Sequence, residues 1–224
     1  MNIASFIDHT LLKPTTTAED IKKLCEEARQ YSFFAVCVPP PLVRNARAAL
    51  KGSAVKIATV IGFPFGYSIA RAKVFEAQQA MQDGADELDV VINLVALKAK
   101  AWPYLESEVK HMIETAHKNE RVVKVIIESG VLTNEEIIKC CEIYAKAGVD
   151  FVKTSTGYAE KGATIEAVQL MRQHLPSDIK IKASGGIRTY EQAMQMIEAG
   201  ANRLGCSASV AIVSGSTGNI STGY

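Results

Sequence analysis

The sequence alternates between short apolar runs and longer segments of helical periodicity, and this alternation repeats almost to the end of the chain. Short runs rich in β-branched residues predict buried strands, whereas apolar residues at every third or fourth position predict amphipathic helices. Eight runs have the strand pattern: residues 5–12, 33–38, 55–62, 87–93, 122–129, 150–157, 179–186 and 203–207. Eight such units in 224 residues favour an α/β fold of the closed (β/α)8 TIM-barrel type. An open doubly wound sheet commonly has only about five or six strands.

Capping residues mark the ends of the predicted helices. Thr133 with Glu136, and Thr189 with Gln192, have the spacing of a capping box, which satisfies free amides at a helix start. Glycines stand where three helices should end: Gly84, Gly148 and Gly200. No linker interrupts the pattern before Ser214. We therefore expect a single barrel domain over residues 1–213 and a short flexible C-terminal tail over residues 214–224.

Charge and composition narrow the class of ligand. The 25 lysines and arginines nearly balance the 24 acidic residues, which predicts no basic surface for nucleic acid or for an anionic membrane. The sequence shows neither a signal peptide nor a run of about 20 apolar residues, so we expect a cytoplasmic protein that binds small molecules. The five cysteines have no metal-site spacing and are expected to be reduced and mainly structural.

Charged residues recur at positions that should face the inside of the barrel. In a closed sheet alternate residues of each strand point into the lumen, which places Lys153 inside together with Phe151 and Ser155. The same alternation places three more charged residues there: Asp89, Lys124 and Lys182. Asp8 on the first strand is expected near them, with its facing left open. A structural explanation also stays open, because long lysine side chains often reach solvent and buried charges such as Lys124 and Asp89 commonly form ion pairs.

Lys153 and Lys182 stand on consecutive predicted strands. Parallel neighbours lie about 4.8 Å apart, so the two ammonium groups repel, and burial further favours loss of a proton from one of them. A neutral amine attacks a carbonyl to form a Schiff base, an electron sink that lets a neighbouring carbon–carbon bond break or form. We predict that Lys153 is the Schiff-base lysine, that Lys182 lowers its pKa, and that Asp89 relays protons. This chemistry requires no metal and no cofactor.

Three loops after the last strands are rich in small residues and predict a phosphate site. The loops read TSTGY, ASGGIRT and GCSAS, and they supply Gly157, Gly185, Gly186 and Ser207. Barrels of this class often bind phosphate through backbone amides of their last loops. A double glycine alone more often marks a tight turn. Arg188 is expected to add positive potential, although an arginine at a helix start is more often only solvated.

Five segments resemble those of the deoxyribose-phosphate aldolase family: IDHTLLKP, ELDVVIN, VKVIIE, DFVKTSTG and IKASGGIRT. They run in a consistent order over residues 3 to about 213. The resemblance implies a cofactor-free class I aldolase that cleaves 2-deoxy-D-ribose 5-phosphate reversibly to D-glyceraldehyde 3-phosphate and acetaldehyde, as in deoxyribonucleotide catabolism. It also implies that Lys153 forms the Schiff base, that Lys182 tunes it, and that Asp89 takes part in proton transfer.

The resemblance also implies a role for the C-terminal residue and shows two departures from the family pattern. Some deoxyribose-phosphate aldolases end in a tyrosine that assists proton transfer at the enamine carbon, which makes Tyr224 a candidate catalytic residue. Pro39 stands where similar sequences often have asparagine, and Ala208 interrupts the more usual pair of serines. Cys37 is expected to serve packing, although an aldehyde substrate makes it a target for inactivation.

Other functions fit the same pattern. A phosphosugar isomerase or another lysine-dependent lyase would keep the barrel and the phosphate site, and a phosphosugar-binding protein would keep them without the chemistry. We expect a homo-oligomer, either a dimer or a tetramer, with phosphosugar and aldehyde substrates as its small-molecule partners.

Overall fold

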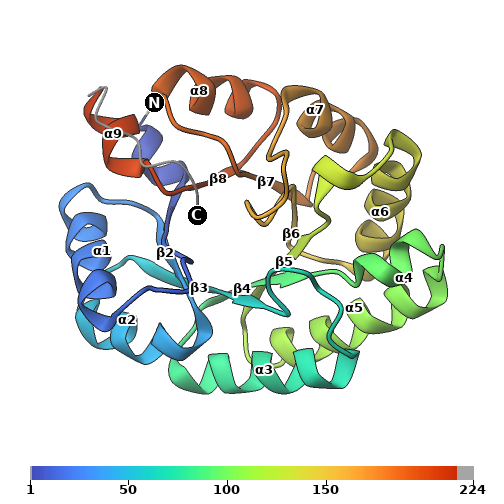
Figure 1. The fold of residues 1–224 in the computed structure, drawn as a ribbon, viewed down its shortest axis with the longest axis horizontal. Helices are drawn as coiled ribbons and strands as arrows, with labels where there is room; N and C mark the ends of the chain where they lie inside the picture. Colours follow the sequence, from blue (N-terminus) through green and yellow to red (C-terminus); the bar gives the residue numbers. More distant parts are fainter. Residues whose placement is uncertain (1, 216–224) are drawn as a thin grey trace.

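Eight parallel strands close into a barrel, and helices surround it on the outside (Figure 1). The computed structural model describes residues 2–215. Its strands follow the chain order around the ring, and β1 closes the ring by pairing with β8. The strands are β1 (Ile7–Thr10), β2 (Ala35–Val38), β3 (Lys56–Ile61), β4 (Glu87–Val91), β5 (Val122–Ile126), β6 (Phe151–Lys153), β7 (Lys180–Ser184) and β8 (Arg203–Cys206). The predicted (β/α)8 TIM barrel is confirmed.

The helices form the outer layer of the barrel. They are α1 (Ala18–Gln30), α2 (Val43–Ala49), α3 (Ala70–Asp83), α4 (Leu94–Lys98), α5 (Trp102–His117), α6 (Asn134–Ala147), α7 (Ile165–His174), α8 (Tyr190–Glu198) and α9 (Ser209–Ser214), with 3-10 turns η1 (Ile3–Phe6), η2 (Pro40–Leu42) and η3 (Ser129–Val131). Both predicted capping boxes are present, at the starts of α6 and α8. Gly84 and Gly148 end α3 and α6 in the left-handed conformation, as their positions predict.

Most strands end earlier than the sequence pattern predicts. The run at 150–157 forms a strand only as far as Lys153, because the chain then bends into a loop that contains Gly157 at a φ of +90°. This early exit at the carboxyl ends of the strands creates the mouth of the barrel, where barrel enzymes place their reactive groups. Among residues 2–215, no helix combines the length and the apolar character needed to cross a membrane.

The apolar core lies mainly between the sheet and the helices. Leu88, Val123 and Ile181 point outward into this layer and are fully buried. Each of them precedes a charged residue on its strand, so the alternation of the strands directs those charges into the lumen. A second, smaller apolar cluster consists of Leu12, Cys37, Ala58 and Val60 with Phe63 packed against it.

Candidate active site

Asp89 on β4 lies at the centre of a buried ion cluster in the barrel lumen. Its Oδ2 atom accepts hydrogen bonds from Lys153 Nζ and from Lys182 Nζ, each at 2.8 Å. Its Oδ1 atom accepts a hydrogen bond from Lys124 Nζ at 2.7 Å. All four side chains are buried. The structure therefore brings together the four inward charges that strand alternation predicted.

Asp8 extends the cluster along β1 and β8. Its Oδ2 atom accepts a short hydrogen bond from Lys182, and its Oδ1 atom lies 2.8 Å from Arg203 Nη1. Glu87, two residues before Asp89 on the same face of β4, lies 2.6 Å from Lys124 Nζ. The facing of Asp8 that the sequence left open is thus inward. Glu87 and Arg203 were not predicted as members of this cluster, although Glu87 shares the alternation of Asp89.

The environment separates the pKa values of the two lysines. Burial is the largest influence on Lys153 and lowers its pKa, the nearby charge of Lys182 lowers it further, and Asp89 opposes both. For Lys182 burial again disfavours the charge, but the carboxylates of Asp8 and Asp89 outweigh it and raise its pKa well above the ordinary value. Lys153 is therefore the lysine whose neutral form is favoured, while Lys182 stays charged.

Both aspartates stay ionised in this setting. Burial disfavours the charge of Asp89, but Lys124, Lys153 and Lys182 hold its pKa well below the usual range. Burial also acts on Asp8, yet Lys182 and Arg203 lower its pKa to about 2. With Lys153 neutral, the ion-paired cluster has three cations, Lys124, Lys182 and Arg203, against three carboxylates, Asp8, Glu87 and Asp89. Charge balance thus agrees with the lowered pKa of Lys153.

Two of the three loops predicted to bind phosphate, those after β6 and β7, pack against each other. Gly157, Gly185 and Gly186 all have positive φ values, between +83° and +90°. A Cβ atom on Gly185 would lie 3.0 Å from Gly162 Cα and 3.5 Å from Gly157 Cα, so the loops after β6 and β7 pack together through glycines. Gly186 is exposed, and a Cβ atom there would meet no described atom within 4 Å. Its backbone is therefore accessible to a ligand.

The family follows from comparison with known proteins. A model of the DeoC/LacD family of aldolases matches residues 3–221. The chain belongs to this family. The deoxyribose-phosphate aldolase of Thermococcus gammatolerans is 55% identical over 217 residues, which cover 96% of each chain. That of Clostridium novyi is 48% identical over the full length of both chains. The tetrameric deoxyribose phosphate aldolase structure from Aeropyrum pernix is 34% identical, with a TM-score of 0.89 over 95% of this chain and 89% of that one.

The other residues predicted for the site differ in how far they are exposed to solvent. Ser207 and Arg188 are both exposed, and the Arg188 backbone N–H donates to the side chain of Gln192 at the start of α8. Cys37 is fully buried in the small apolar cluster, and burial raises the pKa of its thiol to about 11. Tyr224 lies outside the described residues.

Glu128 is a further buried carboxylate that the sequence did not single out. It directly follows the apolar run of β5, and its backbone has a φ of +56°. Its side chain accepts hydrogen bonds from the backbone N–H of Thr156, at 3.1 Å, and from the Thr156 hydroxyl. Burial raises the pKa of Glu128 against the opposing effect of these bonds. Glu128 thereby fixes the turn that leads from Lys153 to Gly157.

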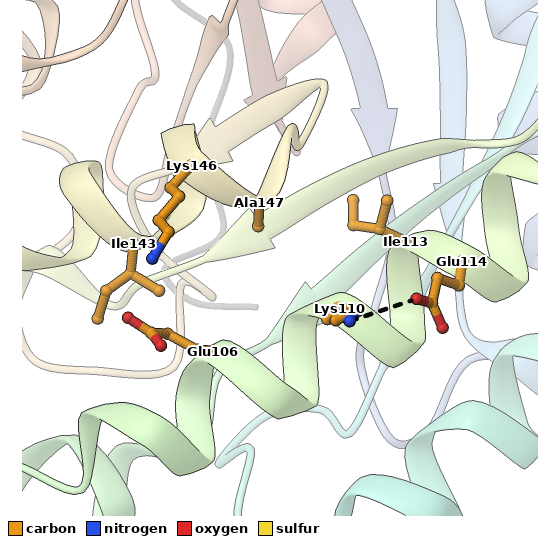
Figure 2. Close-up of a pocket in the computed structure, with 7 residues that line it drawn as sticks. All are labelled: Glu106, Lys110, Ile113, Glu114, Ile143, Lys146 and Ala147. Atoms are coloured by element: carbon orange, nitrogen blue, oxygen red, sulfur yellow. Dashed lines mark ion pairs between the residues drawn. The ribbon is translucent and has the colours of Figure 1, made fainter.

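A pocket on the outside of the aldolase barrel is separate from this site. It has a volume of about 440 Å³ and lies between α5 and α6 (Figure 2). Charged side chains border it, with Ile113 and Ile143 between them, and Lys110 pairs with Glu114 across one turn of α5. Among residues 2–215, none of those predicted for catalysis or phosphate binding lines this pocket.

Proposed function

We propose that the chain cleaves 2-deoxy-D-ribose 5-phosphate reversibly to D-glyceraldehyde 3-phosphate and acetaldehyde through a Schiff base on Lys153. The observation that carries this proposal is the difference between two lysines that share Asp89. Lys153 has a lowered pKa, whereas Lys182 has a raised one. A lysine held partly neutral beside a fixed positive charge has the property that a carbonyl-attacking nucleophile needs.

The reaction begins with attack of the Lys153 nitrogen on the C1 aldehyde of the open-chain sugar. The carbinolamine that forms then loses water to give an iminium ion. The positive nitrogen draws electrons from the C2–C3 bond, which breaks as the C3 hydroxyl gives up its proton and becomes the carbonyl of glyceraldehyde 3-phosphate. The remaining enamine takes a proton at C2, and water hydrolyses the resulting iminium to release acetaldehyde and restore Lys153.

The surrounding charges have separate proposed roles. Lys182 remains a cation, which keeps the pKa of Lys153 low. Asp89 orients both lysines through hydrogen bonds to its Oδ2 atom, and we propose that it relays protons through water. Lys124 and Asp8 support this arrangement through their ion pairs. Tyr224 is the proposed proton donor at C2 of the enamine.

The phosphate of the sugar is proposed to lie at the mouth of the barrel. Backbone amides of Gly157, Gly185, Gly186 and Ser207 would receive it, and Arg188 would add positive potential. Gly186 supports this proposal, because it is exposed and no described atom lies within 4 Å of the position that its Cβ atom would occupy. Such a site favours a substrate that carries its phosphate at the end opposite to the aldehyde.

The direct test supplies purified protein with 2-deoxy-D-ribose 5-phosphate and measures acetaldehyde and glyceraldehyde 3-phosphate separately. Equal amounts of both products are expected, and Lys153→Met should abolish them. Interconversion of phosphosugars without a two-carbon product would instead indicate an isomerase. Binding without turnover would indicate a phosphosugar-binding protein.

We also propose that the protein works in the cytoplasm as a homo-oligomer. Phe65, Tyr67, Ile69 and Phe75 are each more than half exposed and fall within one stretch around the start of α3. Clustered exposed apolar side chains of this size are typical of interfaces. Sedimentation should give a dimer or a tetramer, and Ile69→Asp should shift the protein toward the monomer. A monomer at micromolar concentration for the parental protein would contradict the proposal.

A further inference from the structure

A buried hydroxyl without a described partner lies two residues after Lys153, just beyond the end of β6. Ser155 is fully buried, yet its Oγ atom has no hydrogen-bond partner among residues 2–215. Buried polar groups are nearly always hydrogen-bonded, because they lose their bonds to water when they are buried. An exception beside a binding site indicates that a bound molecule supplies the missing partner.

The register of the barrel places Ser155 one layer above the lysines, toward the mouth. Lys153 pairs with Lys182 at the end of β6, and the Thr154 backbone N–H still donates to the Lys182 carbonyl oxygen at 3.0 Å. The two serines are in contact, because Ser184 Oγ donates to the carbonyl oxygen of Ser155 at 2.6 Å. The Ser184 backbone N–H also donates to the Thr154 hydroxyl at 3.1 Å, so the segment after Lys153 is held against β7 toward the mouth of the barrel.

This layer is built from small residues. Gly205 on β8 pairs with Ser184, and a Cβ atom on Gly205 would lie 2.9 Å from Ser184 Cβ and 3.2 Å from Lys182 Cε. A larger side chain at Gly205 would therefore displace both neighbours. The small side chains of Ser155 and Ser184, together with Gly205, leave space in the lumen on the mouth side of the two lysines. A ligand bound to Lys153 would extend into this space.

Ser155 also lies directly beside the glycine loops. Its Cβ atom is 3.7 Å from the position that a Cβ atom on Gly185 would occupy, and Gly157 and Gly162 are the other neighbours of that position. The hydroxyl of Ser155 thus stands between two ends of the proposed site. Lys153 is at one end, and the loops proposed to bind phosphate are at the other.

We infer that Ser155 is a substrate-binding residue whose hydroxyl forms a hydrogen bond with the C4 hydroxyl of the sugar. The inference rests on the proposed function, in which C1 is attached to Lys153 and the phosphate is attached to C5. Ser155 lies against the loops proposed to bind the phosphate on C5, so its hydroxyl is placed beside the carbon next to C5. That carbon is C4, which becomes C2 of glyceraldehyde 3-phosphate.

The experiment compares two acceptor aldehydes in the synthesis direction with acetaldehyde as donor. One is D-glyceraldehyde 3-phosphate, and the other is 3-phosphopropanal, which keeps the phosphate but lacks the hydroxyl. Ser155→Ala should lower kcat/KM by about tenfold for the first acceptor and by less than about twofold for the second. Its thermal midpoint should not fall, because the substitution breaks no bond within the protein.

Tyr144→Phe is the matched control. The Tyr144 hydroxyl is also buried without a described partner, but it lies behind the sheet beside Val90, Ile92 and Val109. This variant should leave the ratio between the two acceptors unchanged. Equal losses on both acceptors for Ser155→Ala, or no loss on either, would overturn the inference. Failure of the parental protein to convert either acceptor would instead contradict the proposed function.

A third acceptor, D-glyceraldehyde without phosphate, separates the hydroxyl from the phosphate as the partner of Ser155. Ser155→Ala should lower kcat/KM for this acceptor by about the same factor as for its phosphate ester. A loss confined to phosphorylated acceptors would assign Ser155 to the phosphate and overturn the assignment to C4.

Discussion

Lys153 and Lys182 donate hydrogen bonds to the same oxygen atom, Asp89 Oδ2, at 2.8 Å each. Two ammonium groups on one carboxylate oxygen repel each other, which favours loss of a proton from one of them. The lysine with fewer carboxylates beside it loses its proton more readily. Lys182 has Asp8 as a second carboxylate, whereas the described ion pairs of Lys153 include only Asp89. The asymmetry of the cluster therefore selects Lys153 as the amine that loses its proton.

Removal of the charge at position 182 should shift the pH dependence of turnover. Lys182→Met removes the like charge that lowers the pKa of Lys153, so the pKa rises and the neutral amine appears only at higher pH. The rising limb of kcat/KM against pH should move to higher pH, and activity at neutral pH should fall by about a hundredfold. An unmoved profile would show that the two amines do not interact.

A second buried lysine provides the control for that variant. Lys73 is fully buried and pairs with Glu108 at 2.9 Å outside the lumen. Lys73→Met should lower stability, because it leaves a buried carboxylate without its partner. Its pH profile should nevertheless match that of the parental protein.

The aspartates of the cluster should make stability depend on acid pH. The pKa of Asp8 falls from 3.8 to about 2 in the folded protein, which corresponds to about 2 kcal/mol of stability. This contribution is fully present above about pH 4 and is lost as the pH falls toward 2. Asp8→Asn should therefore lower the free energy of unfolding by about 2 kcal/mol or more at pH 7. Urea unfolding should show the difference shrinking at pH 3, and a constant difference would contradict the assignment.

A side chain at position 186 should weaken binding of the phosphorylated sugar more than binding of the unphosphorylated sugar. A valine there projects into the open side of the loop and strains a backbone held at a φ of +83°. Gly186→Val should raise KM for deoxyribose 5-phosphate at least about tenfold more than KM for deoxyribose. Gly52→Val introduces the same residue at a φ of +76° in open space after α2, and it should leave that ratio unchanged. Equal effects of Gly186→Val on both sugars would point to general damage of the loop.

Cys37 should be chemically inert in the folded protein despite its position beside the lysines. Its pKa of about 11 leaves fewer than about one thiol in a thousand ionised at pH 7.5, and the side chain is fully buried. Iodoacetamide should label neither Cys37 nor Cys25 until the protein is unfolded. Cys37→Ala should keep turnover within about threefold of the parental value. Rapid labelling of native Cys37 would contradict this account.

Strand alternation predicted the buried charges well where apolar residues flank them on both sides. Asp89 lies between Leu88 and Val90, and Lys124 lies between Val123 and Val125. The facing of Asp8 could not be predicted in the same way, because its neighbours are Ile7 and His9 and only one of them is apolar. Arg203 is the first residue of β8, where an arginine is usually solvated, and closure of the barrel places it beside Asp8.

Local backbone conformation was harder to predict than the position of the strands. The run through Gly157 has strand composition, yet the chain leaves the sheet after Lys153, where Glu128 binds Thr156 across two loops. That contact joins residues on different βα units, so no pattern within a short window reports it. Short elements such as α4, with five residues, are also too short for a helical period to appear.

Lys153 alone is expected to carry the covalent intermediate, and reductive trapping tests this directly. The protein is incubated with acetaldehyde, reduced with borohydride and digested, and the modified peptide is identified by mass spectrometry. One reduced ethyl group is expected on Lys153 and none in Lys153→Met. A stable ethyl group on Lys182 or Lys124 of the parental protein would contradict it.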